Sequence, residues 1–326
     1  MRYRSRFALV AILWSLHCGI LKGQQPSPVG SSGDVLFQAA MAQLSQGKYV
    51  DAEASFRKLA DLEPATSRGI LGVAEVWVAQ KKNEDALQLL QTEAAKYPNR
   101  LELHFGIGNV ALRAAKYDFA IAEYQTVLDR VDRNSKSAAE LYFRMAEAYR
   151  LKGDLDFAIS LLRQAERLQP DNRAVVNMLA FTLEAAGHRQ AAVDEYRKLL
   201  QYDPNNALAL NNLAYILADM QDDLGLALAY VHRARELFPE EPNFKDTAGW
   251  VYVKLNRVEA SIPLFREVVH ADPNRATYRY HLALALEMNG DHEEASRESE
   301  AALKSNPSKD DEQKIKELLQ RIGRTR

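Results

Sequence analysis

Apolar residues recur along most of the chain at the spacing of amphipathic helices. Between residues 173 and 206, Leu179 and Leu183 fall on one face of a first segment, and Tyr196 and Leu199 on one face of a second. Spacings of three and four residues place side chains on the same side of an α-helix. Gly187 separates the two segments, where glycine makes a left-handed backbone least costly. The pattern predicts a hairpin of two antiparallel helices.

This hairpin pattern recurs with a fixed period. Prolines close the second segment of most hairpins, and the intervals from Pro64 to Pro98 and from Pro170 to Pro204 are each 34 residues. Asp132 takes the proline position of one hairpin and is followed by a short insertion, 135–138, and one further residue is inserted within 222–225. The period predicts eight units. They cover residues 33–66, 67–100, 101–134, 139–172, 173–206, 207–241, 242–275 and 276–309.

Two positions of every unit hold a small residue. Antiparallel helices approach closely only where no bulky side chain separates them. We therefore expect both positions at the contact between the two helices of a hairpin. The eighth position holds Ala40, Ala74, Gly108, Ala146, Ala180, Ala214, Gly249 and Ala283, and the twentieth holds Ala52, Ala86, Ala120, Ala158, Ala192, Ala227, Ser261 and Ala295.

The period of 34 and the small residues in register resemble the tetratricopeptide-repeat (TPR) family over about residues 33–309. The resemblance implies an all-α, right-handed superhelical solenoid of about eight helix-turn-helix units, whose concave groove binds other polypeptides. Lys81, Ala115 and Asn256 depart from the pattern, because they replace the glycine between the two helices of their units.

The pattern of residues 310–326 predicts a capping helix that ends in a basic tail. Ile315, Leu318, Leu319 and Ile322 follow the i, i+3, i+4, i+7 spacing of an apolar helix face. A solenoid exposes the apolar face of its last unit unless a cap covers it. We expect Asp310 or Asp311 to cap the N-terminus of this helix.

The first 23 residues differ from the rest of the chain. Three arginines within the first six residues precede a mostly apolar run, and a linker at 24–32 is rich in Pro, Gly and Ser. This order is typical of a secretory signal peptide. We expect the mature chain to begin near Gln24, in the periplasm or cell envelope. Two alternatives stay open: a short membrane anchor formed by residues 7–21, and acylation of Cys18.

Composition narrows the classes of function. Hydrophobic residues make up 47% of the chain and the formal net charge is −2. No cluster of Lys and Arg indicates nucleic-acid binding. Cys18 is the one cysteine, so a chain without the leader has no thiol for disulfides, catalysis or zinc.

No motif predicts catalysis, a cofactor or a metal site. The Gly106–Gly108 segment lies within a predicted helix and lacks the preceding strand of a phosphate-binding loop. No G-x-S-x-G motif appears. The histidines outside the leader are scattered through different units without metal-ligand spacing, and we expect them to be surface or packing residues. They are His104, His188, His232, His270, His281 and His292.

The resemblance also predicts which side chains line the groove, because in this family the second, fifth, ninth and twelfth positions of each first helix point inward. Amides there can pair with the backbone of an extended peptide, and rings can take its side chains. Rings at these positions also pack between adjacent first helices, so that alternative stays open. The candidates are Phe105, Asn109, Phe143, Asn177, Phe181, Asn211, Tyr215, Asp246, Trp250 and Tyr280.

The predicted groove carries more negative than positive charge. Its acidic residues are Glu75, Glu147, Glu184, Asp219 and Asp246, and no Lys or Arg stands at a fifth or ninth position. This charge disfavours nucleic acids and acidic chain ends as ligands.

We therefore expect a non-catalytic scaffold that binds a protein or peptide, with membrane contact only through an uncleaved leader. The alternatives are a TPR component of a polysaccharide-export or outer-membrane biogenesis machine, and a regulatory subunit of an enzyme.

Overall fold

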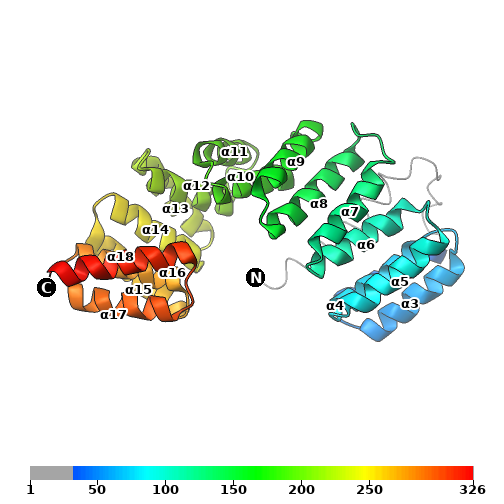
Figure 1. The fold of residues 1–326 in the computed structure, drawn as a ribbon, viewed down its shortest axis with the longest axis horizontal. Helices are drawn as coiled ribbons and strands as arrows, with labels where there is room; N and C mark the ends of the chain where they lie inside the picture. The colour runs from blue at the N-terminus through cyan, green and yellow to red at the C-terminus, as the bar shows by residue number, and fades with distance from the viewer. Residues whose placement is uncertain (1–31, 326) are drawn as a thin grey trace. The chain divides into compact units, whose positions relative to one another are not determined.

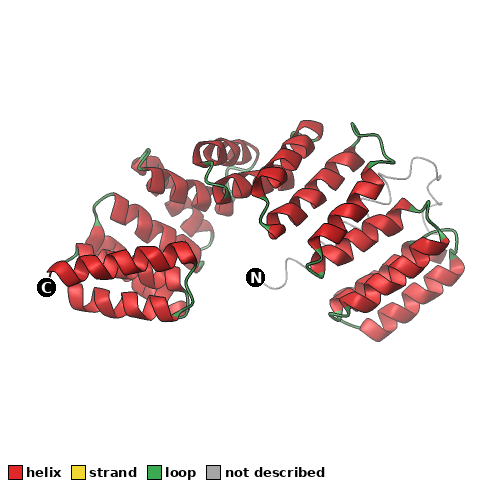
Figure 2. Cartoon of the chain, viewed as in Figure 1, coloured by secondary structure: helices red, strands yellow, loops and turns green. Residues whose placement is uncertain are grey.

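The computed structural model describes residues 32–325, and within this range all regular secondary structure is α-helical (Figures 1 and 2). The chain divides into two compact units with a boundary between Val175 and Val176. The predicted leader, the linker up to residue 31 and Cys18 lie outside the described residues. No helix in the described range is long and apolar enough to cross a membrane.

The first unit consists of consecutive helical hairpins. Each helix packs against its neighbours in sequence, as α2 does against α3 and α3 against α4. The helices are α2 (Ser32–Ser45), α3 (Tyr49–Leu62), α4 (Arg68–Ala79), α5 (Asn83–Lys96), α6 (Leu101–Arg113), α7 (Tyr117–Leu128), α8 (Lys136–Lys152) and α9 (Leu155–Leu168).

The second unit is also built of helical hairpins and ends on an additional helix. The boundary between the units falls within α10 (Arg173–Ala185). The following helices are α11 (Arg189–Tyr202), α12 (Ala207–Met220), α13 (Leu224–Leu237), α14 (Pro242–Lys254), α15 (Val258–Ala271), α16 (Ala276–Met288), α17 (His292–Lys304) and α18 (Lys309–Thr325).

The small residues of the repeat lie inside the helix contacts. All sixteen positions named above are buried. A Cβ atom added to Gly108 would lie 2.6 Å from Cε1 of Tyr124, and one added to Gly249 would lie 2.6 Å from Cε1 of Phe265. In each case a ring from the second helix of the hairpin occupies the space that glycine leaves. The absence of a side chain is therefore a packing requirement at both positions.

The turns within hairpins use a left-handed residue whether or not glycine is present. Gly187, between α10 and α11, has φ +80°. Lys81, Ala115 and Asn256, which replace glycine in the repeat pattern, have φ of 65°, 57° and 57°. The turn geometry thus overrides the conformational preference of these side chains, which disfavours positive φ.

Two helix starts differ from the sequence-based expectation. Helix α8 begins at Lys136, within the segment predicted as an insertion, because the Ser135 hydroxyl accepts a hydrogen bond from the Ala138 amide at 3.1 Å and caps the helix earlier. Helix α18 begins at Lys309, because Ser308 Oγ accepts from the Asp311 amide at 3.1 Å. Ser308 therefore takes the capping role expected of Asp310 or Asp311.

Helix α18 covers the apolar face left by the last hairpin. Ile315, Leu318 and Ile322 are buried, and Leu318 and Ile322 pack in one cluster with Leu282 and Leu286 of α16. This burial removes from water an apolar face that would otherwise be exposed.

Candidate functional site

The predicted groove residues of the first unit contribute mainly to packing. Phe105 is buried, and its ring centroid lies 5.6 Å from that of Tyr124. The Tyr124 hydroxyl donates a hydrogen bond to Asn109 Oδ1 at 2.8 Å. Phe143 is half-buried, and Cζ of the Arg144 guanidinium lies 5.7 Å from the centroid of the Phe143 ring. These contacts favour the packing role that the sequence left open for Phe105.

In the second unit the predicted residues separate into an exposed set and a buried set. Asn177 and Phe181 on α10 are exposed, with 47% of Phe181 accessible to solvent. Tyr215 on α12 and Tyr280 on α16 are half-buried. Asn211, Asp246 and Trp250 are 7%, 8% and 7% exposed, so only a small part of each side chain is accessible.

Of the buried set, Trp250 lies in a stack of rings that crosses three first helices. The Trp250 ring of α14 lies 4.7 Å from the His281 ring of α16 at an interplanar angle of 24°. The Trp250 ring also lies 6.4 Å from the Tyr215 ring of α12, at an interplanar angle of 25°. Lys254 Nζ lies 4.6 Å from the Trp250 centroid. His281 is thus a buried packing residue, and Tyr215 links this stack to the exposed surface.

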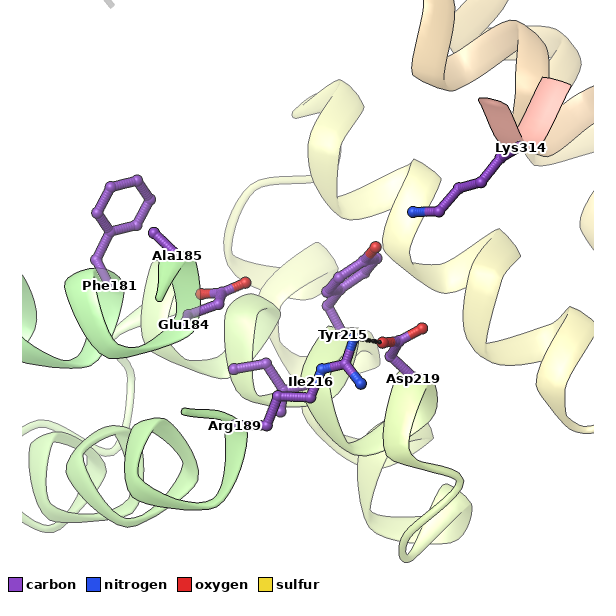
Figure 3. A pocket seen from close by; sticks show the side chains of 8 residues that line it. All are labelled: Phe181, Glu184, Ala185, Arg189, Tyr215, Ile216, Asp219 and Lys314. Carbon is purple, nitrogen blue, oxygen red and sulfur yellow. Dashed lines mark ion pairs between the residues drawn. The ribbon is translucent and has the colours of Figure 1, made fainter. Parts of the chain in front are cut away.

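A cavity of about 560 Å³ opens at the exposed side of Tyr215 (Figure 3). Helices α10 and α12 supply most of the residues that line this cavity. The hairpin turn after α10, which contains the left-handed Gly187, brings the first turn of α11 beside them. The cap helix α18 contributes one side chain from the opposite side. The lining residues are Phe181, Glu184, Ala185, Arg189, Tyr215, Ile216, Asp219 and Lys314.

The carboxylate of Glu184 is held in place by a short chain of hydrogen bonds. The Tyr196 hydroxyl donates to Glu184 Oε2 at 2.9 Å, and Asn212 Nδ2 donates to the Tyr196 hydroxyl oxygen at 3.0 Å. Burial raises the pKa of Glu184 above its ordinary value, and the hydrogen bond from Tyr196 opposes this shift. Among the described residues, no Lys, Arg or His forms an ion pair with Glu184.

The positive charges around the cavity already have partners. The Arg189 guanidinium lies 2.8 Å from Asp219 Oδ2, and Lys254 Nζ lies 4.0 Å from the other oxygen of Asp219. Lys314 Nζ lies 2.5 Å from Asp310 Oδ2. The cavity therefore contains paired cations and one carboxylate without a cationic partner.

Tyr215 presents a protonated hydroxyl to this cavity. Burial raises the pKa of Tyr215 to about 12, and the negative charges of Asp219, Asp246 and Glu184 add to the shift. At neutral pH the phenol keeps its proton and can donate or accept a hydrogen bond.

Sequence reasoning missed part of this site. Lys314 lies on the cap helix and Arg189 at the start of a second helix, and the inner-position rule considers only first helices. No sequence signal placed Tyr196 beneath Glu184. Within the described range, no group of three or more His, Cys, Asp or Glu side chains is arranged to hold a metal ion.

Comparisons with known proteins agree with this architecture. Cellulose synthase operon protein C of Pseudomonas fluorescens is 28% identical over 204 residues, which are 60% of this chain and 16% of that protein. A crystal structure of the Cut9–Hcn1 hetero-tetramer of the APC/C superposes with a TM-score of 0.61 at 16% identity, covering 91% of this chain and 57% of that one. The crystal structure of a tetratricopeptide repeat protein from Parabacteroides merdae superposes with a TM-score of 0.55 at 15% identity, covering 90% of this chain and 99% of that one.

The curated relatives are longer than the matched region, since this chain spans 16% of the first and 20% of a second, the human protein O-mannosyl-transferase TMTC1. The structural likenesses, at low identity, show the fold alone. The family models carry the assignment. One model described as tetratricopeptide repeat matches residues 37–100, 177–242 and 247–310, and a second model with the same description matches residues 99–171. With most of its length matched, the chain belongs to the tetratricopeptide-repeat family.

Proposed function

We propose that this protein is a non-catalytic scaffold that binds a segment of another polypeptide at the cavity of its second unit. The observation that carries the proposal is the cavity of about 560 Å³ between α10 and α12, with Phe181 exposed at its wall. Ligand sites are typically concave, apolar in part, and supplied with a few polar groups that fix orientation. Phe181, Tyr215 and Glu184 provide these features.

The buried Asp246–His281 pair favours a structural role over catalysis. Asp246 Oδ1 lies 2.9 Å from His281 Nδ1, an arrangement also used by general bases. However, Asp246 and His281 are 8% and 4% exposed, and the Trp250 ring covers the imidazole. A general base must come within hydrogen-bonding distance of its substrate, and this imidazole is closed off from solvent.

We further propose that the mature chain acts outside the cytoplasm, in the bacterial cell envelope. In the first 23 residues a positively charged segment precedes a mostly apolar one, and this order supports export. N-terminal sequencing of the native protein tests it. A start near Gln24 supports a cleaved signal peptide, a start at Met1 in a membrane fraction indicates an anchor, and a lipid on Cys18 indicates a lipoprotein.

A role in a polysaccharide-export machine is the second candidate. The similarity to a protein named cellulose synthase operon protein C favours it over other envelope assemblies. The two candidates share the same mode of binding and differ in the identity of the partner.

Affinity capture from the organism's own cell envelope, with two matched variants, tests the proposed function. Phe181→Ala removes the exposed ring at the cavity, whereas Phe157→Ala removes another exposed ring, on α9 of the first unit. A specific partner should be recovered by the wild type and by Phe157→Ala, and lost with Phe181→Ala. Equal recovery by all three proteins would place binding elsewhere. Recovered glycan-export proteins would favour the second candidate.

A further inference from the structure

Glu184 is the unusual group of the cavity, because no cation in the described part of the chain pairs with its carboxylate. It accepts one hydrogen bond, from the Tyr196 hydroxyl. The other carboxylate of the lining, Asp219, is paired with Arg189 at 2.8 Å. Lys314 approaches from α18 but is paired with Asp310 at 2.5 Å. Figure 3 shows the Glu184 carboxylate directed into the cavity, on the side facing Tyr215.

The fold does not require this negative charge. Partial burial of a carboxylate without a cationic partner disfavours the folded state. A glutamine would accept the same hydrogen bond from Tyr196 without that penalty. A charge that lowers stability and is directed into an open cavity is best explained by a ligand that balances it.

The rings beside Glu184 also suit a cation. Phe181 and Tyr215 both line the cavity, and the face of an aromatic ring attracts ammonium and guanidinium groups. The second unit already contains such a contact, because Lys254 Nζ lies 4.6 Å from the centroid of Trp250. The apolar stem of a Lys or Arg side chain can also pack along the rings while its charged end reaches a carboxylate.

We propose that the cavity receives a lysine or arginine side chain of the bound polypeptide, whose charged end pairs with Glu184 while its stem lies against Phe181 and Tyr215. This inference rests on the proposed function and adds the chemistry of the partner. An acidic side chain would have to displace Asp219 from Arg189 or Asp310 from Lys314, and it would approach Glu184 with like charge.

Two mixtures of capped peptides with random flanking residues test this proposal. One mixture carries lysine at its central position and the other carries norleucine, which has a similar apolar stem and no charge. The peptides retained by the immobilised mature chain are quantified by mass spectrometry at neutral pH. We expect lysine to be favoured about tenfold, the scale of one charge-assisted hydrogen bond.

Two variants locate the charge that is recognised. Glu184→Gln keeps the acceptor for Tyr196 and should abolish the preference for lysine. Glu293→Gln makes the same chemical change at an exposed residue of α17 that does not line the cavity, and it should leave the preference intact. Circular dichroism confirms that both variants are folded.

The outcomes separate this inference from the proposed function. Equal retention of both mixtures would overturn the cation preference while leaving a peptide-binding scaffold. Retention of neither mixture would overturn both. A lysine preference that survives in Glu184→Gln would overturn the assignment to this cavity, because the charge would be recognised elsewhere.

Discussion

The carboxylate of Asp246 lies 2.9 Å from Nδ1 of His281 and joins two neighbouring first helices, α14 and α16, inside the core of the second unit. Asp246 stands at the fifth position of its predicted unit and His281 at the sixth of the next. The imidazole also stacks on Trp250 at 4.7 Å. A buried polar contact of this kind fixes the register between adjacent repeats, because either group left alone would be unsatisfied.

A double-mutant cycle measures how strongly this pair couples the two helices. Asp246→Ala should destabilise the protein by about 1–3 kcal/mol, because the buried imidazole loses its acceptor. Asp246→Asn keeps an acceptor oxygen and should cost less. Together with His281→Ala and the double variant, urea unfolding should give a coupling energy of about 0.5–3 kcal/mol. Additive effects of the two alanine substitutions would mean that the contact contributes no coupling.

Trp250 and Phe181 should respond in opposite ways to truncation. Trp250 is 7% exposed within a stack of rings, so Trp250→Ala should lower the free energy of unfolding by about 3–5 kcal/mol. Phe181 is 47% exposed, so Phe181→Ala should change stability by about 0.5 kcal/mol or less. It should instead weaken peptide binding by about tenfold.

Denaturant unfolding and peptide titration of the folded variants distinguish these roles. The sequence-based hypothesis placed both rings in the groove, and their different burial predicts different roles for them. A stable Trp250→Ala variant with weakened binding would return the indole to the ligand site.

The glycines at helix contacts predict a steric penalty. Gly249→Ala places a methyl group 2.6 Å from Cε1 of Phe265, and Gly108→Ala does the same against Tyr124. Each should destabilise the protein by about 1–3 kcal/mol through overpacking. Gly323→Ala on α18 is the matched control, since no atom lies within 4 Å of its added Cβ. The control should be neutral or stabilising by about 0.5–1 kcal/mol, because alanine favours helix. Equal thermal shifts at all three sites would exclude the steric explanation.

The left-handed turn residues offer sites of stabilisation. Ala115 has φ +57°, whereas the adjacent Ala114 has φ −81°. Ala115→Gly should raise the free energy of unfolding by about 0.5–1 kcal/mol, because glycine removes the steric penalty of positive φ. Ala114→Gly should lower it by up to about 1 kcal/mol, because there only the entropy cost of glycine remains. Melting temperatures that shift in the same direction for both variants would contradict this reasoning.

The repeat could be predicted from sequence because its determinants are local and periodic. The small residue at Gly249 and the glycine at Gly187 each report a backbone constraint that recurs in every hairpin. The resemblance to the tetratricopeptide-repeat family rested on the 34-residue register of these positions. The helix starts at Lys136 and Lys309 were missed because a single serine hydroxyl, at Ser135 or Ser308, caps each helix earlier than the repeat pattern implies.

The site was only partly predictable, because it depends on contacts between segments distant in sequence. The inner positions identified Phe181 and Tyr215, which line the cavity. The same rule could not tell that Trp250 is covered by its neighbours, since burial depends on the rings of Tyr215 and His281. Lys314 enters the site from the cap helix, which lies outside the repeat altogether.

The titration of Glu184 should make the stability of the protein depend on pH. Burial raises the pKa of this carboxyl above its ordinary value of 4.5, against the hydrogen bond from Tyr196. The folded protein therefore retains a proton that the unfolded chain releases, so the wild type loses stability as pH rises from the ordinary value through the raised one. Glu184→Gln has no such titration and keeps the acceptor. Its stability relative to the wild type should therefore increase over that window and level off at neutral pH.

The other groups facing Glu184 are unchanged in the variant, so the difference between the two proteins isolates this carboxyl. Urea unfolding of both proteins across the window measures the difference, and one that is flat or grows towards low pH would contradict the prediction. The groups held constant are Tyr196 and Arg189 of α11, Tyr215 and Asp219 of α12, and Lys314 of α18.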